Sequence, residues 1–359
     1  MDFGLSDEQE MLQETVKGFL DQEFSPARSR ELFNSASSHD GALWNGLCEM
    51  GVAGLVIPEA FGGGGLSALE LSLVSEVLGA AAAPVPFVEH SLAARALARA
   101  GSADQQARWL PALAEGTALG TVAFGEEGGA WGPRSWSVRV EDQRIWGEVL
   151  YVSCAEVADL MVVGVEGGGL VAVERESPGL KIQGLEGLDR TRSLSRVEFE
   201  GVPCAVLSTT PQLAEETLAV GHVALAADGF GAATRLLDAT VEYAKTREQF
   251  GQSIAQFQAV KHQIARLGLE IEPTRALWWH AAYAVDHLPD HAERLPALAK
   301  SHVGDRASAL ARMAVELHGG LGFTWECDVQ IWLKRILFDR GYLGSPESLR
   351  EDCARLGGW

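Results

Sequence analysis

The stretch from Arg247 to Gln258, which reads REQFGQSIAQFQ, carries side chains suited to binding a charged ligand. An arginine held beside a turn can bind a diphosphate, because its planar guanidinium presents several donors together. Gln258 can hydrogen-bond the edge of an adenine or a ribose. Gly251 follows a helical pattern, where a glycine suits a C-terminal cap with a positive φ angle. The stretch is therefore expected to join two helices, and a hairpin with a merely solvated arginine is the simpler alternative.

A second candidate stretch runs from Glu316 to Phe323 and reads ELHGGLGF. Gly319 and Gly320 predict the C-terminal end of a helix. Backbone without side chains also allows a flat or charged group to approach closely. Glu316 would repel a diphosphate, but its carboxylate could accept a hydrogen bond from a ribose or an adenine. A helix end with no ligand is the alternative.

Residues 1 to about 116 show the spacing of amphipathic helices throughout. Ser6 with Gln9, and Ser67 with Glu70, each have the spacing of a capping box at a helix N-terminus. These signals predict an N-terminal domain that is entirely helical.

From Thr121 the spacing of apolar residues becomes short and alternating, and turns rich in glycine such as 167–169 separate the runs. Several short strands at this spacing predict a small antiparallel β barrel or sandwich. The expected strands are Thr121–Phe124, Trp136–Val140, Arg144–Trp146, Val149–Ser153, Leu160–Val165, Leu170–Val173 and Val197–Val202.

Helical spacing returns from about residue 210 and predicts a very long helix or helix pair before the 247–258 stretch. Pro273 should break the helix that follows, since proline lacks a backbone donor and clashes with the preceding turn. Pro296 is well placed at the start of the helix that runs to Leu317.

The Arg247–Gln258 hairpin, the Glu316–Phe323 segment and the passage MGVAGLVIPEAFGG from Met50 to Gly63 resemble the acyl-CoA dehydrogenase family. The resemblance covers nearly the whole chain. It implies an α+β multidomain fold: an N-terminal helical domain (1–116), a middle β barrel or sandwich (117–207) and a C-terminal four-helix bundle (208–359). It also implies bound FAD, shared with a neighbouring subunit. The residues expected to contact FAD are Arg247, Gln249, Phe250, Phe257, Gln258, Glu316, Gly319, Gly320, Tyr151 and Ser153.

The middle domain departs from the family pattern. Where relatives have a TEPGAGSD-like strand end that holds flavin and substrate, this chain has FGEEGG at 124–129. The W-x-T motif beside the flavin ring is replaced by Tyr151, Val152 and Ser153, although tyrosine can stack and serine can donate a hydrogen bond. An ordinary β core is the alternative for this region.

The resemblance also implies a reaction, α,β-dehydrogenation of an acyl-CoA, in which a carboxylate removes the α proton and a hydride passes to the flavin. Where the family has a YEG motif this chain has Tyr342–Gly344, and Leu343 cannot accept a proton. At the family's second position for the base, this chain has Gly221 and His222. His222 could titrate in a useful range, although a lone histidine in an apolar helix is usually structural, and Asp228 is the nearby acid.

This pattern resembles the subunit without a base in heteromeric acyl-CoA dehydrogenases, including those that act on steroid side-chain CoA thioesters. We therefore expect a two- or fourfold hetero-oligomer with a base-bearing subunit, and an electron-transferring flavoprotein as electron acceptor. Two alternatives remain at this point. One is a self-sufficient homo-oligomer with a non-standard base, and the other is a structural subunit without flavin.

The net charge of −20 over 359 residues argues against broad nucleic-acid binding, which requires clustered basic residues. The five cysteines are scattered and never in C-x-x-C spacing, which favours a reduced cytoplasm over disulfides or a zinc site. Residues 1–20 carry acids and do not read as a signal peptide. No apolar run approaches the length of a membrane span, so a cytoplasmic protein is expected.

Overall fold

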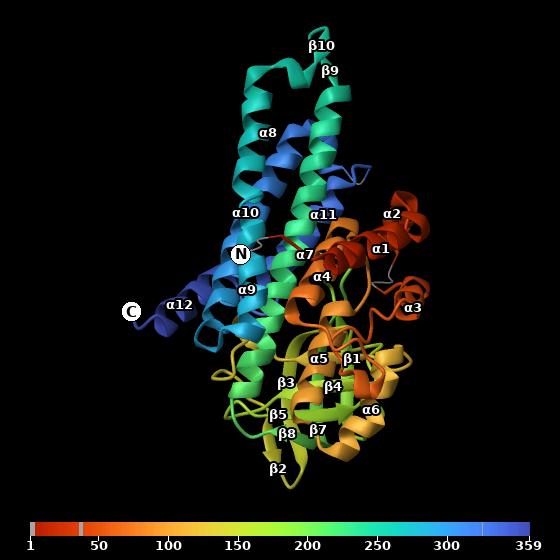
Figure 1. Ribbon diagram of the computed structural model, residues 1–359, viewed down its shortest axis with the longest axis vertical. Coiled ribbons are helices and arrows are strands. Elements are labelled where there is room, and N and C mark those ends of the chain that lie inside the picture. The colour runs from red at the N-terminus through yellow and green to blue at the C-terminus, as the bar shows by residue number, and fades with distance from the viewer. Residues whose placement is uncertain (1–3, 36–38, 325) are drawn as a thin grey trace.

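A computed structural model describes residues 4–35, 39–324 and 326–359. Helices of the N-terminal part pack beside a long helical bundle, and the β domain lies at the opposite end of the molecule from the tip of the hairpin between α7 (Gln212–Thr246) and α8 (Gln258–Ile271) (Figure 1). The capping boxes expected at Ser6 and Ser67 are both formed. The N-terminal helices are α1 (Asp7–Glu23), α2 (Pro26–Asn34), α3 (Gly41–Glu49), α4 (Ala68–Ala81), α5 (Phe87–Ala100) and α6 (Ala103–Glu115), with a 3₁₀ turn at Glu59–Phe61.

The middle domain forms two four-stranded sheets, in the orders β1-β4-β5-β8 and β2-β3-β7-β6. Most neighbours are antiparallel as expected, but β1 and β4 pair in parallel, with Gly120 opposite Leu160. Two expected strands at 144–153 are one continuous strand, and β6 and β8 were not among the expected strands. The strands are β1 (Gly120–Ala123), β2 (Arg139–Glu141), β3 (Arg144–Ser153), β4 (Leu160–Gly164), β5 (Leu170–Glu174), β6 (Leu180–Leu185), β7 (Leu194–Pro203) and β8 (Ala205–Ser208).

The C-terminal part is a helical bundle built around α7, a single helix of 35 residues. Pro273 separates two helices, as its missing donor requires. Pro296 lies in the first turn of the helix ending at Leu317, two residues after its start. The helices are α7 (Gln212–Thr246), α8 (Gln258–Ile271), α9 (Thr274–His287), α10 (Arg294–Leu317), α11 (Val329–Gly341) and α12 (Pro346–Leu356). None of the helices in the described ranges is long and apolar enough to span a membrane.

Glycines set the close contact between α4 and α7. A Cβ atom added at Gly79 would lie 2.1 Å from the carbonyl oxygen of Asp228, and one added at Gly231 would lie 1.9 Å from that of Glu76. Such distances are far below van der Waals contact, so the two backbones can only approach this closely where side chains are absent. The N-terminal domain is thereby fixed against the bundle.

A buried group of charges fixes the β domain against the same bundle. Arg335 on α11 donates from Nε and Nη2 to the two oxygens of Asp228, each at 2.7 Å. Its Nη1 donates to Thr191 Oγ1 at 2.8 Å, in the loop between β6 and β7. Arg192 in that loop also donates to Asp228, to Oδ2 at 3.3 Å. One carboxylate on α7 therefore holds the β-domain loop and α11 together.

Candidate functional site

The α7–α8 hairpin ends in a tight β turn at the tip of the molecule (Figure 1). Helix α7 stops at Arg247, and two short strands, β9 (Glu248–Gln249) and β10 (Gln252–Ser253), pair in antiparallel fashion. Phe250 and Gly251 occupy the turn with φ angles of 55° and 79°. Gly251 thus has the expected positive φ, but it serves a hairpin turn rather than a helix cap. Two successive positive φ angles are typical of the two-residue turns that join the strands of a β-hairpin.

The glycine-rich segment after α10 lies beside this hairpin. The Tyr243 and His318 rings stack with centroids 4.2 Å apart, and the Tyr243 hydroxyl donates to the His318 carbonyl oxygen at 3.3 Å. His318 caps α10, and Gly319 follows with a φ of 60°, as expected for a helix end. The two stretches singled out in the sequence are therefore brought to the same end of the bundle.

The side chains at this end are unusually open to solvent. Phe250 is 94% exposed and Phe323 76% exposed, which is costly for aromatic rings unless another surface covers them. Phe257 is half-buried and packs edge-on against Phe250 at 6.2 Å. The remaining predicted contacts at this end are all exposed: Arg247, Gln249, Gln258, Glu316, Gly319 and Gly320.

These residues offer what the dinucleotide end of FAD requires. The Arg247 guanidinium can bind a diphosphate, and the amides of Gln249 and Gln258 can bind the adenine or ribose. A Cβ placed at Gly319 or Gly320 would meet nothing within 4 Å, so the backbone there is open to an approaching group. The donors and the open backbone fit the adenine and diphosphate end of a flavin dinucleotide.

The predicted contacts in the β domain are placed differently. Ser153 is fully buried, with its Oγ 3.5 Å from Cys154 Sγ. Tyr151 is half-buried and packs against Trp131 with ring centroids 6.1 Å apart. Trp131 in turn meets Tyr342 edge-on at 5.0 Å. Trp131 therefore packs between Tyr151 of the β domain and Tyr342, which follows the end of α11.

The two positions at which the resemblance expects a base lie side by side. A Cβ at Gly221 would come 2.5 Å from Leu343 Cδ1, and His222 Nε2 lies 2.9 Å from the Leu343 carbonyl oxygen. Since a carbonyl only accepts, Nε2 carries the proton and donates it. Leu343 and His222 both line a pocket of about 270 Å³, and neither contributes a carboxylate.

The electrostatics of this pocket do not favour His222 as a base. Burial, together with the nearby Lys300 ammonium, lowers the pKa of His222 to about 3. Lys300 is itself buried, donates to the Gly344 carbonyl oxygen at 2.6 Å, and has a pKa that burial lowers to about 7. Burial and the neighbouring Glu293 raise the pKa of Glu215, which also lines the pocket.

Asp228, the other candidate base, lies elsewhere and is fully occupied. Its side chain is 0% exposed, and both oxygens accept from Arg335. Burial opposes its ionisation, but the two guanidiniums of Arg335 and Arg192 prevail and hold its pKa below the ordinary value. Its geometry is that of an ion pair linking elements, with no oxygen available to a substrate.

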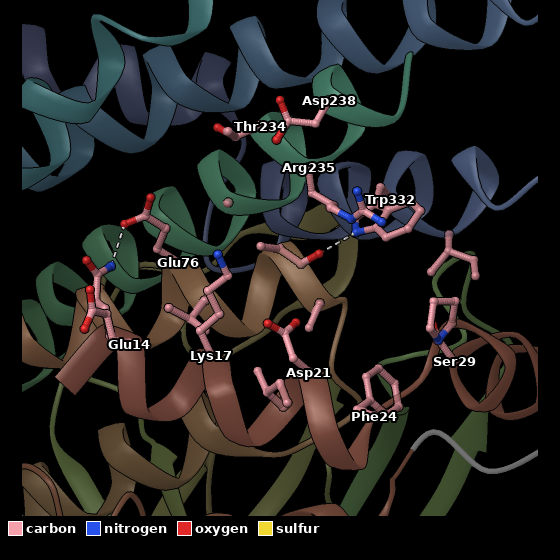
Figure 2. A pocket seen from close by; sticks show the side chains of 18 of the residues that line it. Glu14, Lys17, Asp21, Phe24, Ser29, Glu76, Thr234, Arg235, Asp238 and Trp332 are labelled. Carbon is pink, nitrogen blue, oxygen red and sulfur yellow. Dashed lines mark hydrogen bonds between the residues drawn. The ribbon is translucent and has the colours of Figure 1, made fainter. Parts of the chain in front are cut away.

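A larger cavity, of about 950 Å³, lies between α1, α4, α7 and α11 and contains none of the residues predicted as site residues. Figure 2 shows Lys17 and Asp21 of α1 on one side of it and Arg235 and Asp238 of α7 on the other. The Arg235 guanidinium lies 5.4 Å from the centroid of a Trp332 ring. Charges of both signs line its two walls, so its chemistry selects no single ligand class.

Trp131, Tyr342 and Lys300 were missed as residues that shape the candidate site. Trp131 lies in a loop without periodicity, and Lys300 lies on the buried side of a helix where lysine is rarely found. Tyr342 could have been noticed in the sequence, because it precedes Leu343 at the family's base position. Only its contact with Trp131 shows that it fills space.

The chain resembles known proteins over nearly its whole length. Residues 6–117 match the model of the acyl-CoA dehydrogenase N-terminal domain, and residues 212–357 match that of the C-terminal domain. The chain is 34% identical to the acyl-CoA dehydrogenase IpdE2 of Mycolicibacterium smegmatis, over 98% of each chain.

Two solved heteromeric structures are also similar. The Tcur3481-Tcur3483 steroid acyl-CoA dehydrogenase (G363A variant) matches with a TM-score of 0.91 and 29% identity, over 98% of each chain. The ChsE4-ChsE5 complex of Mycobacterium tuberculosis matches with a TM-score of 0.91 and 27% identity, over 100% of this chain and 99% of that one. With both terminal domains matched and a relative at this identity along its whole length, the chain belongs to the acyl-CoA dehydrogenase family of oxidoreductases.

Proposed function

We propose that this chain is one subunit of an FAD-dependent enzyme that desaturates the α,β bond of an acyl-CoA thioester, and that a partner subunit supplies the catalytic base. The chain binds the adenine and diphosphate end of an FAD whose ring lies in the partner. Arg247, Gln249 and Gln258 contact that end, and Glu316 with the following glycines lines it.

The observation that carries the proposal is the contrast between the two halves of the predicted flavin site. The residues for the dinucleotide end are exposed at the tip of the bundle, together with uncovered Phe250. The residues for the ring end are buried or packed against Trp131, as Ser153 and Tyr151 are. A chain with this arrangement can reach a flavin held by a neighbour, while Tyr151 and Ser153 are packed within the chain itself.

The missing carboxylate supports the same division of labour. Leu343 occupies one position for the base, and the neutral His222 occupies the other with its Nε2 proton donated to a carbonyl. When bound, FAD would supply the hydride acceptor, and removal of the α proton then requires a carboxylate base from elsewhere. The likeness to two heteromeric complexes, one described as a steroid enzyme, favours a steroid-type or related acyl group. We propose an electron-transferring flavoprotein as the electron acceptor.

The test is to purify the chain alone and with base-bearing dehydrogenase-like chains encoded beside it, and to measure flavin content and acyl-CoA-dependent flavin bleaching. We expect bleaching only in the complex. Arg247→Gln should weaken FAD retention by roughly tenfold to a hundredfold, because a charge-assisted hydrogen bond contributes about 1.5–3 kcal/mol. Lys245→Gln, one residue inside the exposed end of α7, is the matched control and should retain flavin normally.

Full flavin loading and turnover by the chain alone would refute the need for a partner. Complexes of Arg247→Gln that retain flavin as tightly as Lys245→Gln would remove Arg247 from the proposed site.

A further inference from the structure

The hairpin that carries Arg247 projects from the last packed turn of α7. Ala244 is buried, whereas every residue from Lys245 to Gly251 is exposed. Tyr243, beside Ala244, is half-buried, and its carbonyl oxygen accepts from the backbone N–H of Arg247 at 2.8 Å. The position of the Arg247 hairpin is therefore set by how the turn that contains Tyr243 packs.

Tyr243 packs on the residue that precedes the glycine-rich segment. Its ring lies over that of His318 with centroids 4.2 Å apart and an angle of 22° between the planes. Its hydroxyl also donates to the His318 carbonyl oxygen at 3.3 Å. A ring contact and a hydrogen bond together fix both the distance and the orientation between the two helix ends.

The imidazole of His318 is itself held in place. Its Nδ1 lies 2.7 Å from the carbonyl oxygen of Ala314, and since a carbonyl only accepts, Nδ1 carries the proton. His318 is buried, and this burial lowers the pKa of its imidazole, so the ring is neutral at neutral pH and stacks without burying a charge. It therefore presents a fixed, uncharged surface to Tyr243.

The glycine-rich segment that follows His318 folds back on α10. A Cβ placed at Gly322 would lie 2.5 Å from the Val315 carbonyl oxygen and 3.0 Å from His318 Cβ, so a glycine is needed for this approach. Gln330 of α11 donates from Nε2 to the Gly322 carbonyl oxygen. His318 thus connects an anchored segment on one side with Tyr243 on the other.

We infer that Tyr243 and His318 are positioning residues for the dinucleotide site. Their stacked rings hold the Arg247 hairpin in register with the open backbone of Gly319 and Gly320, so that both halves of the site bind FAD as one unit. A site ordered before binding loses less conformational freedom when the ligand arrives, so the pair raises affinity without contacting FAD. The inference rests on the proposed function, which assigns both segments to the adenine and diphosphate end of FAD.

The test measures FAD retention by the complex with a base-bearing subunit, and amide hydrogen exchange of residues 247–253 in the lone chain. Tyr243→Ala should weaken retention roughly tenfold, and Tyr243→Phe, which keeps the ring and loses the hydroxyl, about threefold. In the lone chain, Tyr243→Ala should speed exchange of the hairpin amides about tenfold, because the hairpin opens more often.

The matched control is a second stacked pair of the same chemistry. Tyr283 and His287 lie on α9 with ring centroids 4.4 Å apart, and Tyr283 is exposed. Tyr283→Ala should therefore change both retention and hairpin exchange by less than about twofold, as is usual for a surface substitution.

A double-mutant cycle separates positioning from a general loss of stability. If Tyr243 acts through Arg247, adding Tyr243→Ala to Arg247→Gln should weaken retention by less than about twofold more, because the contact that Tyr243 positions is already lost. Effects that add in full, or an effect of Tyr243→Ala no larger than that of Tyr283→Ala, would overturn the inference.

Thermal melting checks that Tyr243→Ala is folded. If it is not, Tyr243→Phe carries the test, and retention and exchange equal to those of the parent would then overturn the inference. Normal retention by Tyr243→Ala beside weakened retention by Arg247→Gln would refute the positioning role alone. Normal retention by Arg247→Gln would instead refute the proposed FAD site itself.

Discussion

Replacing Arg335 by methionine would test whether one buried cation holds the β domain to the helical bundle. Arg335 is 0% exposed and uses three of its nitrogens on Asp228 and Thr191. Methionine fills similar space but donates nothing, so Arg192, at 3.3 Å, would be the guanidinium left to Asp228. The variant therefore leaves a buried carboxylate only partly compensated.

The expected cost follows from the asymmetry of buried ion pairs. Removing one partner of such a pair typically destabilises a protein by about 3–5 kcal/mol, because the remaining charge stays buried. The residual contact with Arg192 places the expected value near the lower end, about 3 kcal/mol. With an unfolding entropy of about 2.1 cal/mol/K per residue over a chain of this length, the melting temperature should fall by about 4 °C.

The assay is denaturant and thermal unfolding of three variants beside the parent. Arg335→Lys keeps the charge but loses the fork, so we expect about half of the loss seen for Arg335→Met. Arg340→Met is the control: Arg340 bonds Asp305 at 3.1 Å near the surface, and exposed pairs contribute about 0–1 kcal/mol. Equal destabilisation by Arg335→Met and Arg340→Met would refute the reasoning that this network couples the two domains.

Three further predictions concern packing, pH and the base position. Gly231→Ala should lower the free energy of unfolding by about 1–3 kcal/mol in a denaturant titration, because its Cβ would overlap the Glu76 carbonyl. The control Gly268→Ala meets only a side chain at 3.8 Å and should stabilise α8 by about 0.5–1 kcal/mol. The reverse order of stabilities would contradict the contact described for α4 and α7. Burial lowers the pKa of Lys300 in the folded chain to about 7, whereas Lys300 in the unfolded chain stays protonated up to about pH 10.5. The free energy of unfolding should therefore rise with pH between these two values, because the unfolded state binds more protons there. Measured by denaturant titration across this pH range, the rise should be smaller in Lys300→Met than in the parent. Leu343→Glu should leave the lone chain inactive in the flavin-bleaching assay, because under the proposed function the flavin ring lies in the partner subunit. Restored bleaching would show that only the carboxylate was missing.

Several features were fixed by local chemistry and could be predicted without the structure. The capping boxes at Ser6 and Ser67 need only residues three positions apart, and Pro273 ends a helix wherever it stands. The helical, β and helical order of the chain follows from periods of apolar residues, which are local as well. The resemblance of the Arg247–Gln258 stretch to a known family pattern also depends only on the types of contiguous residues.

Strand pairing was harder to predict, because it joins residues far apart in the sequence. Nothing local distinguishes a parallel β1–β4 pair from an antiparallel one, and β6 has exposed residues on both faces. The turn at Phe250 shows the same limit: a positive φ at Gly251 was predictable, but a hairpin turn instead of a helix cap depended on how far α7 extends.

The sequence by itself determined the family, the order of the domains and the absence of a carboxylate at Leu343, because each depends on residue types in a contiguous stretch. Only the tertiary structure decided that Gly221 and His222 both lie against Leu343, that Asp228 is bound by two guanidiniums, and that Trp131 lies against Tyr342. These contacts join residues that are distant along the chain, and they form because the glycines of α4 and α7 and the buried charges of α11 fix how the domains pack. The exposure of one half of the predicted flavin site and the burial of the other is a property of that packing.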